Sequence, residues 1–338
     1  MAQDHIIIIG NGPAGNQAAR TLKDRAPDAR ITLISKDHDS CYRPHLLPSY
    51  ISGKRTREDL YACPLASYKE AGIKLRTGQR VVHIRLDSRE AVLEHKEIIP
   101  FSGLILAVGG RPRIPEPLHR FKDLMLSLKT LEDAERWKEK LEGAESVLII
   151  GGDLTSFAMT RALLDLGKKV YVLLTEEAFW PMRPDKKTFE RAAESLALKG
   201  VDVLETGSIK SMTRRSEGHV RVVVEDRRLE VGLVGAFFGL APDVGFLARS
   251  GLTLDRGILV DDRLHTGFDG VYATGDCAQV YHPEIRDYWV SIGYDNAVSL
   301  GRMAALNLLG GDRRTDVPKE RILEVQGVHV NTSWWTEF

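Results

Sequence analysis

Cysteine is scarce in this chain, with only Cys41, Cys63 and Cys277 among 338 residues. No two of them stand close enough for a C-x-x-C or C-x4-C pattern, so a local redox disulfide is excluded. The same spacing argues against a zinc or iron–sulfur site built from the cysteines of this chain alone. We therefore expect reduced thiols, two of them buried, and no bound metal.

Long apolar runs and an excess of one charge are also missing. The chain has 47 basic and 47 acidic residues, hence a formal net charge of 0, which argues against nucleic acid or an anionic membrane as the main partner. Its longest apolar runs have about five or six residues, far short of the ~20 that span a membrane. The start, MAQDHIIIIGNG, lacks the basic segment and apolar stretch of a secretory signal. We expect a cytoplasmic protein without a membrane span.

What is present is an ordinary globular composition, 43% apolar and 28% charged, in a chain long enough for two domains. Two stretches share one pattern, in which a buried apolar strand leads through a glycine turn into a helix and a second strand. The first comprises strand 6–9, turn 10–15, helix 16–25 and strand 31–34, and the second comprises strand 147–150, turn 151–153, helix 154–166 and strand 170–174. The repetition indicates a duplicated nucleotide-binding half.

Two Pro/Gly-rich segments, 109–117 and 239–245, are typical of hinges between domains, because proline fixes φ and glycine frees it. The simplest arrangement is a first domain made from both chain ends, with the second inserted between the hinges. Each domain carries additional antiparallel strands, and the predicted fold class is α/β, with two Rossmann-like domains of three-layer β-β-α architecture. The predicted elements outside the repeats are strands 81–86, 91–93, 220–224, 258–260 and 271–273 and a helical run from 289 or so to 309.

The segment Gly10-x-Gly12-x-x-Gly15 lies between a buried strand and a helix, the context in which this motif binds a dinucleotide. Gly10 permits the tight turn, Gly12 lets the backbone approach a diphosphate, and Gly15 allows the helix to pack on the strand. The helix start adds free N–H groups and a partial positive charge. Ser35 and Lys36 replace the acid expected at the end of the next strand. This weakens an NAD assignment more than an FAD assignment, because FAD has many other anchors.

Two later segments supply such anchors. Residues 104–111 form an apolar strand that ends in glycines, and residues 270–276 form a strand that ends in Gly275-Asp276. A carboxylate at a glycine turn beside a helix suits a ribitol hydroxyl. The alternative for Asp276 is an ordinary helix N-cap.

In these motifs, the chain resembles the pyridine nucleotide–disulfide oxidoreductase superfamily from Ile6 to about Gly311. The segment CYRPHLLP at 41–48 resembles a region of rubredoxin-reductase-like enzymes and of the FAD portion of NAD(P)H nitrite reductases. The resemblance implies an FAD-binding domain over 1–115 and 243–312, an NAD(P)-binding-like domain over 116–242, and a short tail over 313–338. The residues expected to line FAD are Gly10, Gly12, Pro13, Ala14, Gly15, Ser35, Lys36, Arg43, Pro44, Val82, Ala107, Val108, Gly109, Arg111, Gly275 and Asp276.

The family also places a basic residue close to the flavin, for which Arg43 and Lys54 are candidates. A cation there stabilises reduced, anionic flavin, and the alternative for Arg43 is a surface arginine. His45 aligns with the reactive cysteine of single-cysteine reductases and is a candidate proton donor; a packed or solvated histidine is the alternative. Cys41 is expected to be a bystander, so a disulfide reductase is not expected.

The second glycine turn reads Gly151-Gly152-Asp153-Leu154-Thr155-Ser156, where the family expects G-x-G-x-x-G. A carboxylate at Asp153 would repel a diphosphate by roughly 1–4 kcal/mol, and its β-carbon would block the close approach of the backbone. We expect a degenerate NAD site of Gly151, Gly152, Asp153, Thr155 and Ser156 that has lost or weakened nicotinamide binding. The alternative is that Asp153 points away and NADH still binds.

These observations favour an FAD-dependent oxidoreductase that passes electrons through its flavin between a donor and a redox protein or a partner subunit carrying iron–sulfur or haem. NAD(P)H remains possible but doubtful as a second cofactor. The alternatives are a self-contained NAD(P)H-dependent flavin reductase and a non-catalytic flavoprotein subunit. Trp334 and Trp335 could cap the flavin, dock a partner or cover the chain's own core, and an oligomer is possible.

Overall fold

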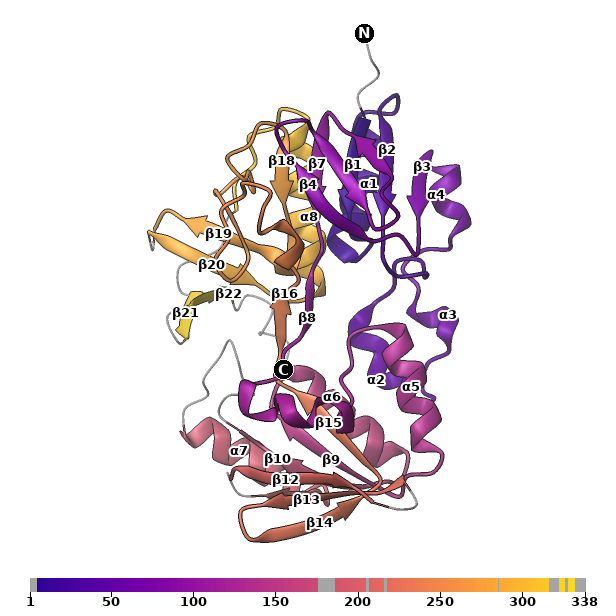
Figure 1. Ribbon diagram of the computed structural model, residues 1–338, viewed down its shortest axis with the longest axis vertical. Coiled ribbons are helices and arrows are strands. Elements are labelled where there is room, and N and C mark those ends of the chain that lie inside the picture. Colours follow the sequence, from indigo (N-terminus) through magenta and orange to yellow (C-terminus); the bar gives the residue numbers. More distant parts are fainter. Residues whose placement is uncertain are drawn as a thin grey trace. The chain divides into compact units, whose positions relative to one another are not determined.

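The computed structural model describes residues 5–175, 186–204, 207–215, 218–284, 286–315, 322–325 and 328–331 (Figure 1). The chain divides into two compact units. Unit 1 comprises Met1–Arg43, Tyr61–Gly110 and Pro242–Phe338, and unit 2 comprises Pro44–Leu60 and Arg111–Ala241. The chain of unit 2 is therefore inserted into the chain of unit 1.

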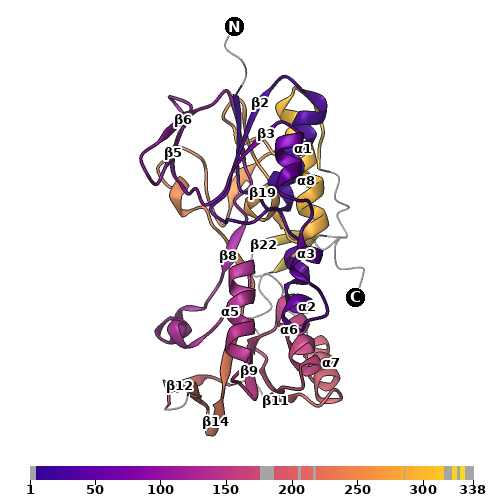
Figure 2. The same ribbon diagram turned by 90° about the vertical axis from the view of Figure 1, so that its right-hand side faces the viewer.

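Unit 1 is built on a parallel five-stranded sheet in the order β18-β7-β1-β2-β3. Its strands are β1 (His5–Ile9), β2 (Arg30–Ile34), β3 (Ile73–Arg76), β7 (Gly103–Leu106) and β18 (Val271–Ala273). Every residue of β1 is buried, as expected for a strand covered on both faces. Helices α1 (Pro13–Arg25) and α8 (Tyr294–Leu308) pack on each other along one side of this sheet (Figure 2).

Two smaller sheets complete unit 1. The antiparallel sheet β4-β5-β6 lies on the opposite side of the main sheet from α1 and α8 (Figure 2); its strands are β4 (Val81–Arg85), β5 (Glu90–Leu93) and β6 (Ile98–Pro100). The second sheet has the order β17-β19-β20-β22-β21. Its strands are β17 (Ile258–Val260), β19 (Ala278–His282), β20 (Asp287–Ser291), β21 (Ile322–Val325) and β22 (Val328–Asn331). One apolar core joins the main sheet, α1, α8 and both smaller sheets.

Unit 2 repeats the plan with a parallel sheet in the order β11-β10-β9-β15 and an antiparallel sheet β12-β13-β14. The strands are β9 (Ser146–Gly151), β10 (Lys169–Leu173), β11 (Asp202–Leu204), β12 (Ile209–Arg214), β13 (Val220–Val224), β14 (Arg227–Val231) and β15 (Leu233–Phe237). The helices are α2 (Leu47–Ile51), α3 (Arg57–Leu60), α5 (Leu131–Leu141), α6 (Leu154–Asp165) and α7 (Lys186–Ala197).

The chain passes between the units along β8 (Gly110–Pro112) and β16 (Leu240–Pro242), which pair with each other within the predicted hinge segments. The remaining elements are α4 (Ala66–Glu70) and the short turns of 3-10 helix η1 (Pro44–Leu46), η2 (Glu116–Leu124), η5 (Gly245–Leu247) and η6 (Gly275–Cys277). The predicted α/β class, with two Rossmann-like halves and the second inserted in the first, is confirmed.

Three local features differ from the expectations. Residues 287–291 form strand β20, so the helical run predicted from 289 is wrong at its start; Gly293, at φ 110°, separates the strand from α8. Residues 44–60, predicted within the first domain, pack in unit 2, where the Tyr50 hydroxyl donates to the Glu135 carboxylate at 2.6 Å. The described part of the predicted tail adds β21 and β22 to a sheet of unit 1. Trp334 and Trp335 lie outside the described residues.

Candidate functional site

The first glycine turn is fixed by two glycines that have no room for a side chain. Gly10 has φ +105°, and a Cβ on it would overlap the carbonyl oxygen of Ala107, just after β7. A Cβ on Gly15 would overlap the carbonyl oxygen of Gly10. The turn, the end of β7 and the start of α1 are therefore packed backbone against backbone, as predicted for Gly10 and Gly15.

Gly12 lies at the N-cap of α1 and leaves the space in front of the helix open. No side chain caps α1, and a Cβ on Gly12 would meet nothing within 4 Å. Pro13 occupies the first helical turn, where its missing N–H costs no hydrogen bond, and Ala14 is buried. The free N–H groups and the partial positive charge of the helix start face this space. An anionic phosphate is the kind of group that such a helix start binds.

A buried polar network supports this turn from within unit 1. The Tyr68 hydroxyl donates to Asn11 Oδ1 at 2.9 Å and accepts from Asn16 Nδ2 at 2.6 Å. Asn11 Nδ2 is buried without a hydrogen-bond partner. An orphaned donor inside the glycine turn is a further sign that the turn is built around a ligand, because buried polar groups are costly unless paired.

The end of β18 adds the predicted carboxylate to the same edge of the sheet. Gly275, at φ +72°, starts η6, and a Cβ on it would lie 3.0 Å from Ala14 Cβ at the start of α1. Asp276 follows and is half-buried. Since β1 and β18 are parallel strands of one sheet, their carboxyl ends bring Asp276 to the side on which the glycine turn opens.

The end of β7 and the end of β2 complete this edge. Gly109 has φ +63° with open space around its Cβ position, and its carbonyl accepts from Asp243 N at 3.0 Å; Val108 is half-buried. Lys36 Nζ lies 2.8 Å from the Asp243 carboxylate, and the Ser35 hydroxyl accepts from Asp37 N at 3.1 Å. Both residues that replace the expected acid therefore already have protein partners.

Val82 lies at a bulge in β4. Val81 pairs with Leu93 and His83 pairs with Val92, so Val82 is an extra residue that interrupts the ladder. Its side chain is 38% exposed. A bulge leaves the backbone of the extra residue without a ladder partner; that Val82 lines FAD remains a prediction.

The residues predicted to lie beside the flavin belong partly to unit 1 and partly to unit 2. Arg43 is the last residue of its segment of unit 1, and its guanidinium donates to the Tyr61 carbonyl at 2.9 Å. Pro44 and the exposed His45 lie in η1 of unit 2, and the exposed Arg111 also belongs to unit 2. Lys54, in unit 2, forms an ion pair with Asp165 at 2.5 Å.

Tyr294, which sequence reasoning missed, is the first residue of α8 and meets Arg43. Burial raises the pKa of the Tyr294 phenol, whereas the charge of Arg43 and a hydrogen bond from it lower that pKa. The only signal in the sequence was a tyrosine directly after the glycine that precedes the helix.

Two of the three cysteines, Cys41 and Cys277, have the properties of inert, buried thiols. Burial raises the pKa of the Cys41 thiol to about 12 and that of the Cys277 thiol to about 11, so both stay protonated near neutrality. Cys63 is half-buried; burial raises its pKa, but hydrogen bonds from Tyr68, Arg20 and neighbouring serines lower it by more, so its pKa lies below the usual range. Of the three, two are buried, as predicted.

The second glycine turn keeps the geometry of the first but is filled. Gly151 has φ +138°, and a Cβ on it would overlap the carbonyl oxygen of Phe237. Asp153 caps α6: its carboxylate accepts from Ser156 N and from Gly239 N, each at 2.8 Å. The Ser156 hydroxyl donates to the Asp153 carbonyl at 2.6 Å. Gly152 is buried and Thr155 is half-buried.

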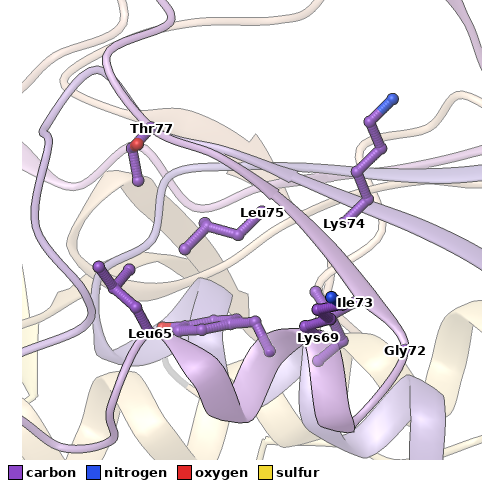
Figure 3. Close-up of a pocket in the computed structure, with 8 residues that line it drawn as sticks. Leu65, Lys69, Gly72, Ile73, Lys74, Leu75 and Thr77 are labelled. Atoms are coloured by element: carbon purple, nitrogen blue, oxygen red, sulfur yellow. The ribbon is translucent and has the colours of Figure 1, made fainter.

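A surface cavity of about 510 Å³ lies elsewhere, between α4 and β3 (Figure 3). Leu65, Ile73 and Leu75 give it an apolar wall, and Lys69 and Lys74 stand at its rim. None of its lining residues belongs to either glycine turn, so it is not the predicted cofactor site.

Within the described part of the chain, no group of three or more His, Cys, Asp or Glu side chains could hold a metal ion, and no helix is long and apolar enough to cross a membrane.

Residues 4–295 match the model of the pyridine nucleotide-disulphide oxidoreductase family, and the chain belongs to this family. Among its relatives, putidaredoxin reductase CamA of Pseudomonas putida is 30% identical over 328 residues, covering 91% of this chain and 75% of the relative. The nitric oxide reductase FlRd-NAD(+) reductase of Citrobacter koseri is 27% identical over 317 residues, covering 93% and 81%. A solved ferredoxin reductase for the CYP199A2 system from Rhodopseudomonas palustris has a TM-score of 0.83 and 25% identity, over 93% of this chain and 78% of that one.

These comparisons confirm the predicted family, and with it the prediction of an FAD-dependent oxidoreductase of the electron-transfer type. Its cofactor is FAD. The residues that hold the FAD remain predictions, and the glycine turn, Asp276 and the open backbone at Gly109 form a cradle in unit 1 that fits it.

Proposed function

We propose that the protein passes electrons through FAD between a donor and a separate redox protein, such as a small iron–sulfur protein, or a partner subunit that carries iron–sulfur or haem. The observation that carries this proposal is an open FAD cradle in unit 1, in a chain whose cysteines form neither a C-x-x-C nor a C-x4-C pattern. A flavin exchanges electrons in pairs or singly and needs no protein nucleophile to do so.

Different residues of unit 1 bind different parts of FAD. The start of α1 at Gly12 holds the diphosphate with backbone N–H groups, and Asp276 accepts a hydrogen bond from the ribitol chain. Arg43 supplies the positive charge that favours a reduced, anionic flavin. The bond from Arg43 to the Tyr61 carbonyl keeps that charge in one place. Arg43 also donates a hydrogen bond to Tyr294.

The names of the relatives support a protein partner. Two of them are reductases of named electron carriers, putidaredoxin and ferredoxin. Two of the three thiols, Cys41 and Cys277, offer no route of their own, because they are buried with raised pKa values. A redox protein is therefore the acceptor or donor that these observations favour.

One experiment tests this proposal directly. The flavin is reduced by light with an external donor under anaerobic conditions and then mixed with an oxidised ferredoxin or with rubredoxin. We expect the visible flavin absorption to return at micromolar concentrations of at least one carrier, with matching reduction of that carrier. A flavin that stays reduced with every carrier, but reoxidises at once in air, would contradict the proposal.

A self-contained NAD(P)H-dependent reductase is the second candidate. It is favoured by the NAD(+) in the name of the Citrobacter koseri relative and by the Rossmann-like β9-α6-β10 unit. It differs from the first proposal in requiring that NADH alone, at micromolar concentration, reduces the flavin rapidly. Cytoplasmic location and an oligomeric state remain predictions for either candidate.

A further inference from the structure

The two glycine turns of this chain are equivalent position by position. Gly10 and Gly151 both have positive φ, and a Cβ on either would overlap the carbonyl oxygen of a neighbouring strand end, Ala107 in unit 1 and Phe237 in unit 2. Two residues beyond each of those carbonyls stands another glycine with positive φ, Gly109 in one unit and Gly239 in the other (φ +63° and +77°). The backbone frame for a diphosphate is therefore present twice.

The frames differ in what fills them. In unit 1 the helix-start residue is Gly12, and the positions of a Cβ on Gly12 or on Gly109 are both empty to 4 Å. In unit 2 the equivalent residue is Asp153, whose carboxylate reaches from the start of α6 to Gly239. One oxygen accepts from Ser156 N and the other from Gly239 N, at 2.8 Å each.

In this arrangement the Asp153 side chain makes the kind of hydrogen bonds that a bound phosphate would make. A carboxylate, like a phosphate, is an anion whose oxygens accept from backbone N–H groups at a helix start. The same N–H groups cannot serve a second anion while the first holds them. In addition, Ser156 stands where Gly15 stands in unit 1, and it is buried.

We propose that the Asp153 carboxylate is a built-in occupant of the dinucleotide site of unit 2, so that a nicotinamide dinucleotide binds there only by displacing it. Asp153 is then a specificity-determining residue that shifts the choice of electron donor from NAD(P)H to a redox protein. Only the effect of Asp153 on the choice of electron donor rests on the proposed function. Binding of a dinucleotide at the site is measured without any electron transfer.

The test compares the wild type with Asp153→Gly, which empties the site, and Asp153→Asn, which keeps the size and one acceptor but removes the charge. Asp133→Asn is the matched control, because Asp133 accepts N–H bonds at the start of α5 in the same unit. Binding of NADH to the photoreduced holoprotein is measured by anaerobic calorimetry, because a flavin that is already reduced cannot accept a hydride, and thermal unfolding checks that each variant is folded.

We expect millimolar binding by the wild type and by Asp133→Asn. Asp153→Gly should bind NADH about five- to 150-fold more tightly, which corresponds to ~1–3 kcal/mol, and Asp153→Asn should gain at least about fivefold. If Asp153→Gly fails to fold, Asp153→Asn decides alone. Micromolar binding by the wild type, or no gain in a folded Asp153→Asn, would overturn the inference.

The same preparations separate this inference from the proposed function. Photoreduced wild type that reoxidises with a carrier supports the proposed function whatever NADH does. If no carrier reoxidises it but Asp153→Asn still gains NADH affinity, the proposed function is wrong and the inference about Asp153 stands.

Discussion

Single residues carry most of the difference between the two halves of this protein. Gly12 and Asp153 occupy equivalent positions at the start of α1 and of α6, yet one leaves a helix start open and the other closes it. The sequence predicted that Asp153 would obstruct the second site through repulsion and bulk. The structure adds a physical reason: the side chain folds back onto Ser156 N and Gly239 N.

Asp276 is predicted to be an anchor for FAD. We expect Asp276→Ala to lose FAD affinity by about tenfold or more, because a charge-assisted hydrogen bond is worth about 1.5–3 kcal/mol. Ultrafiltration of the diluted holoprotein measures the flavin retained. Asp269→Ala is the control, since the Asp269 carboxylate is 96% exposed and its partner is Arg89. Equal retention in the two variants would remove Asp276 from the site.

The charge of Asp153 gives a prediction about pH. Burial raises the pKa of this carboxyl above 3.8, and backbone N–H groups of Ser156, Gly239 and Thr155 oppose the rise. A raised pKa means that the carboxylate binds a proton at a higher pH than an ordinary aspartate. NADH affinity of the wild type should therefore increase between about pH 7 and about pH 5, whereas that of Asp153→Asn should stay level. Calorimetry at both pH values checks this; parallel profiles would contradict it.

The cysteines are predicted to be dispensable for flavin reduction. Cys41→Ser, Cys63→Ser and Cys277→Ser should each bind FAD and be photoreduced like the wild type, because the two buried thiols are protonated and the sequence has no C-x-x-C or C-x4-C pattern. Absorption spectra of the reduced proteins are the measurement. A long-wavelength charge-transfer band that disappears in one variant would identify a redox thiol and restore a disulfide-reductase function. Cys63, with its lowered pKa, is the most informative of the three.

At the level of elements, the β1-turn-α1 unit yields a matched pair of glycine variants. Gly15→Ala should destabilise the fold by about 1–3 kcal/mol or more, because its Cβ would overlap the Gly10 carbonyl. Gly12→Ala should fold normally, since its Cβ meets no protein atom within 4 Å, but should bind FAD about tenfold or more weakly. Thermal unfolding of the apoproteins and flavin retention separate the two effects. A Gly12→Ala protein with full FAD affinity would contradict the placement of the diphosphate.

Local elements were predictable where one short pattern decides the structure. The run Ile6–Ile9 followed by the glycine turn specifies a buried strand and a helix start without help from distant residues. Helix α6 begins at the predicted residue, whereas α1 begins at Pro13, three residues before the predicted start. Strand β20 was misassigned because its Trp289 fits both a helix and a sheet pattern, and only pairing with β19 decides between them. Residues 44–60 were misplaced for a similar reason, since contacts such as Tyr50 with Glu135 are distant in sequence.

For the whole molecule, the sequence predicted the fold class and the cofactor because duplication and glycine turns are global signals. It could not place the side chains that complete the site. Tyr294 meets Arg43 only through folding, and Val82 is exposed at a bulge that no spacing reveals. Lys54 carries a charge that suits a flavin, yet in unit 2 it is already paired with Asp165.

The most direct measurement is an anaerobic comparison of electron donors on the oxidised holoprotein. Flavin bleaching is followed by stopped flow with NADH, with NADPH and with a reduced ferredoxin, each over micromolar to millimolar concentrations. We expect the reduced ferredoxin to bleach the flavin rapidly at micromolar concentration, and both nucleotides to act slowly or only at millimolar concentration. Rapid bleaching by micromolar NADH would contradict the closed site at Asp153, and the absence of any reaction with the reduced ferredoxin would contradict a redox protein as the electron donor.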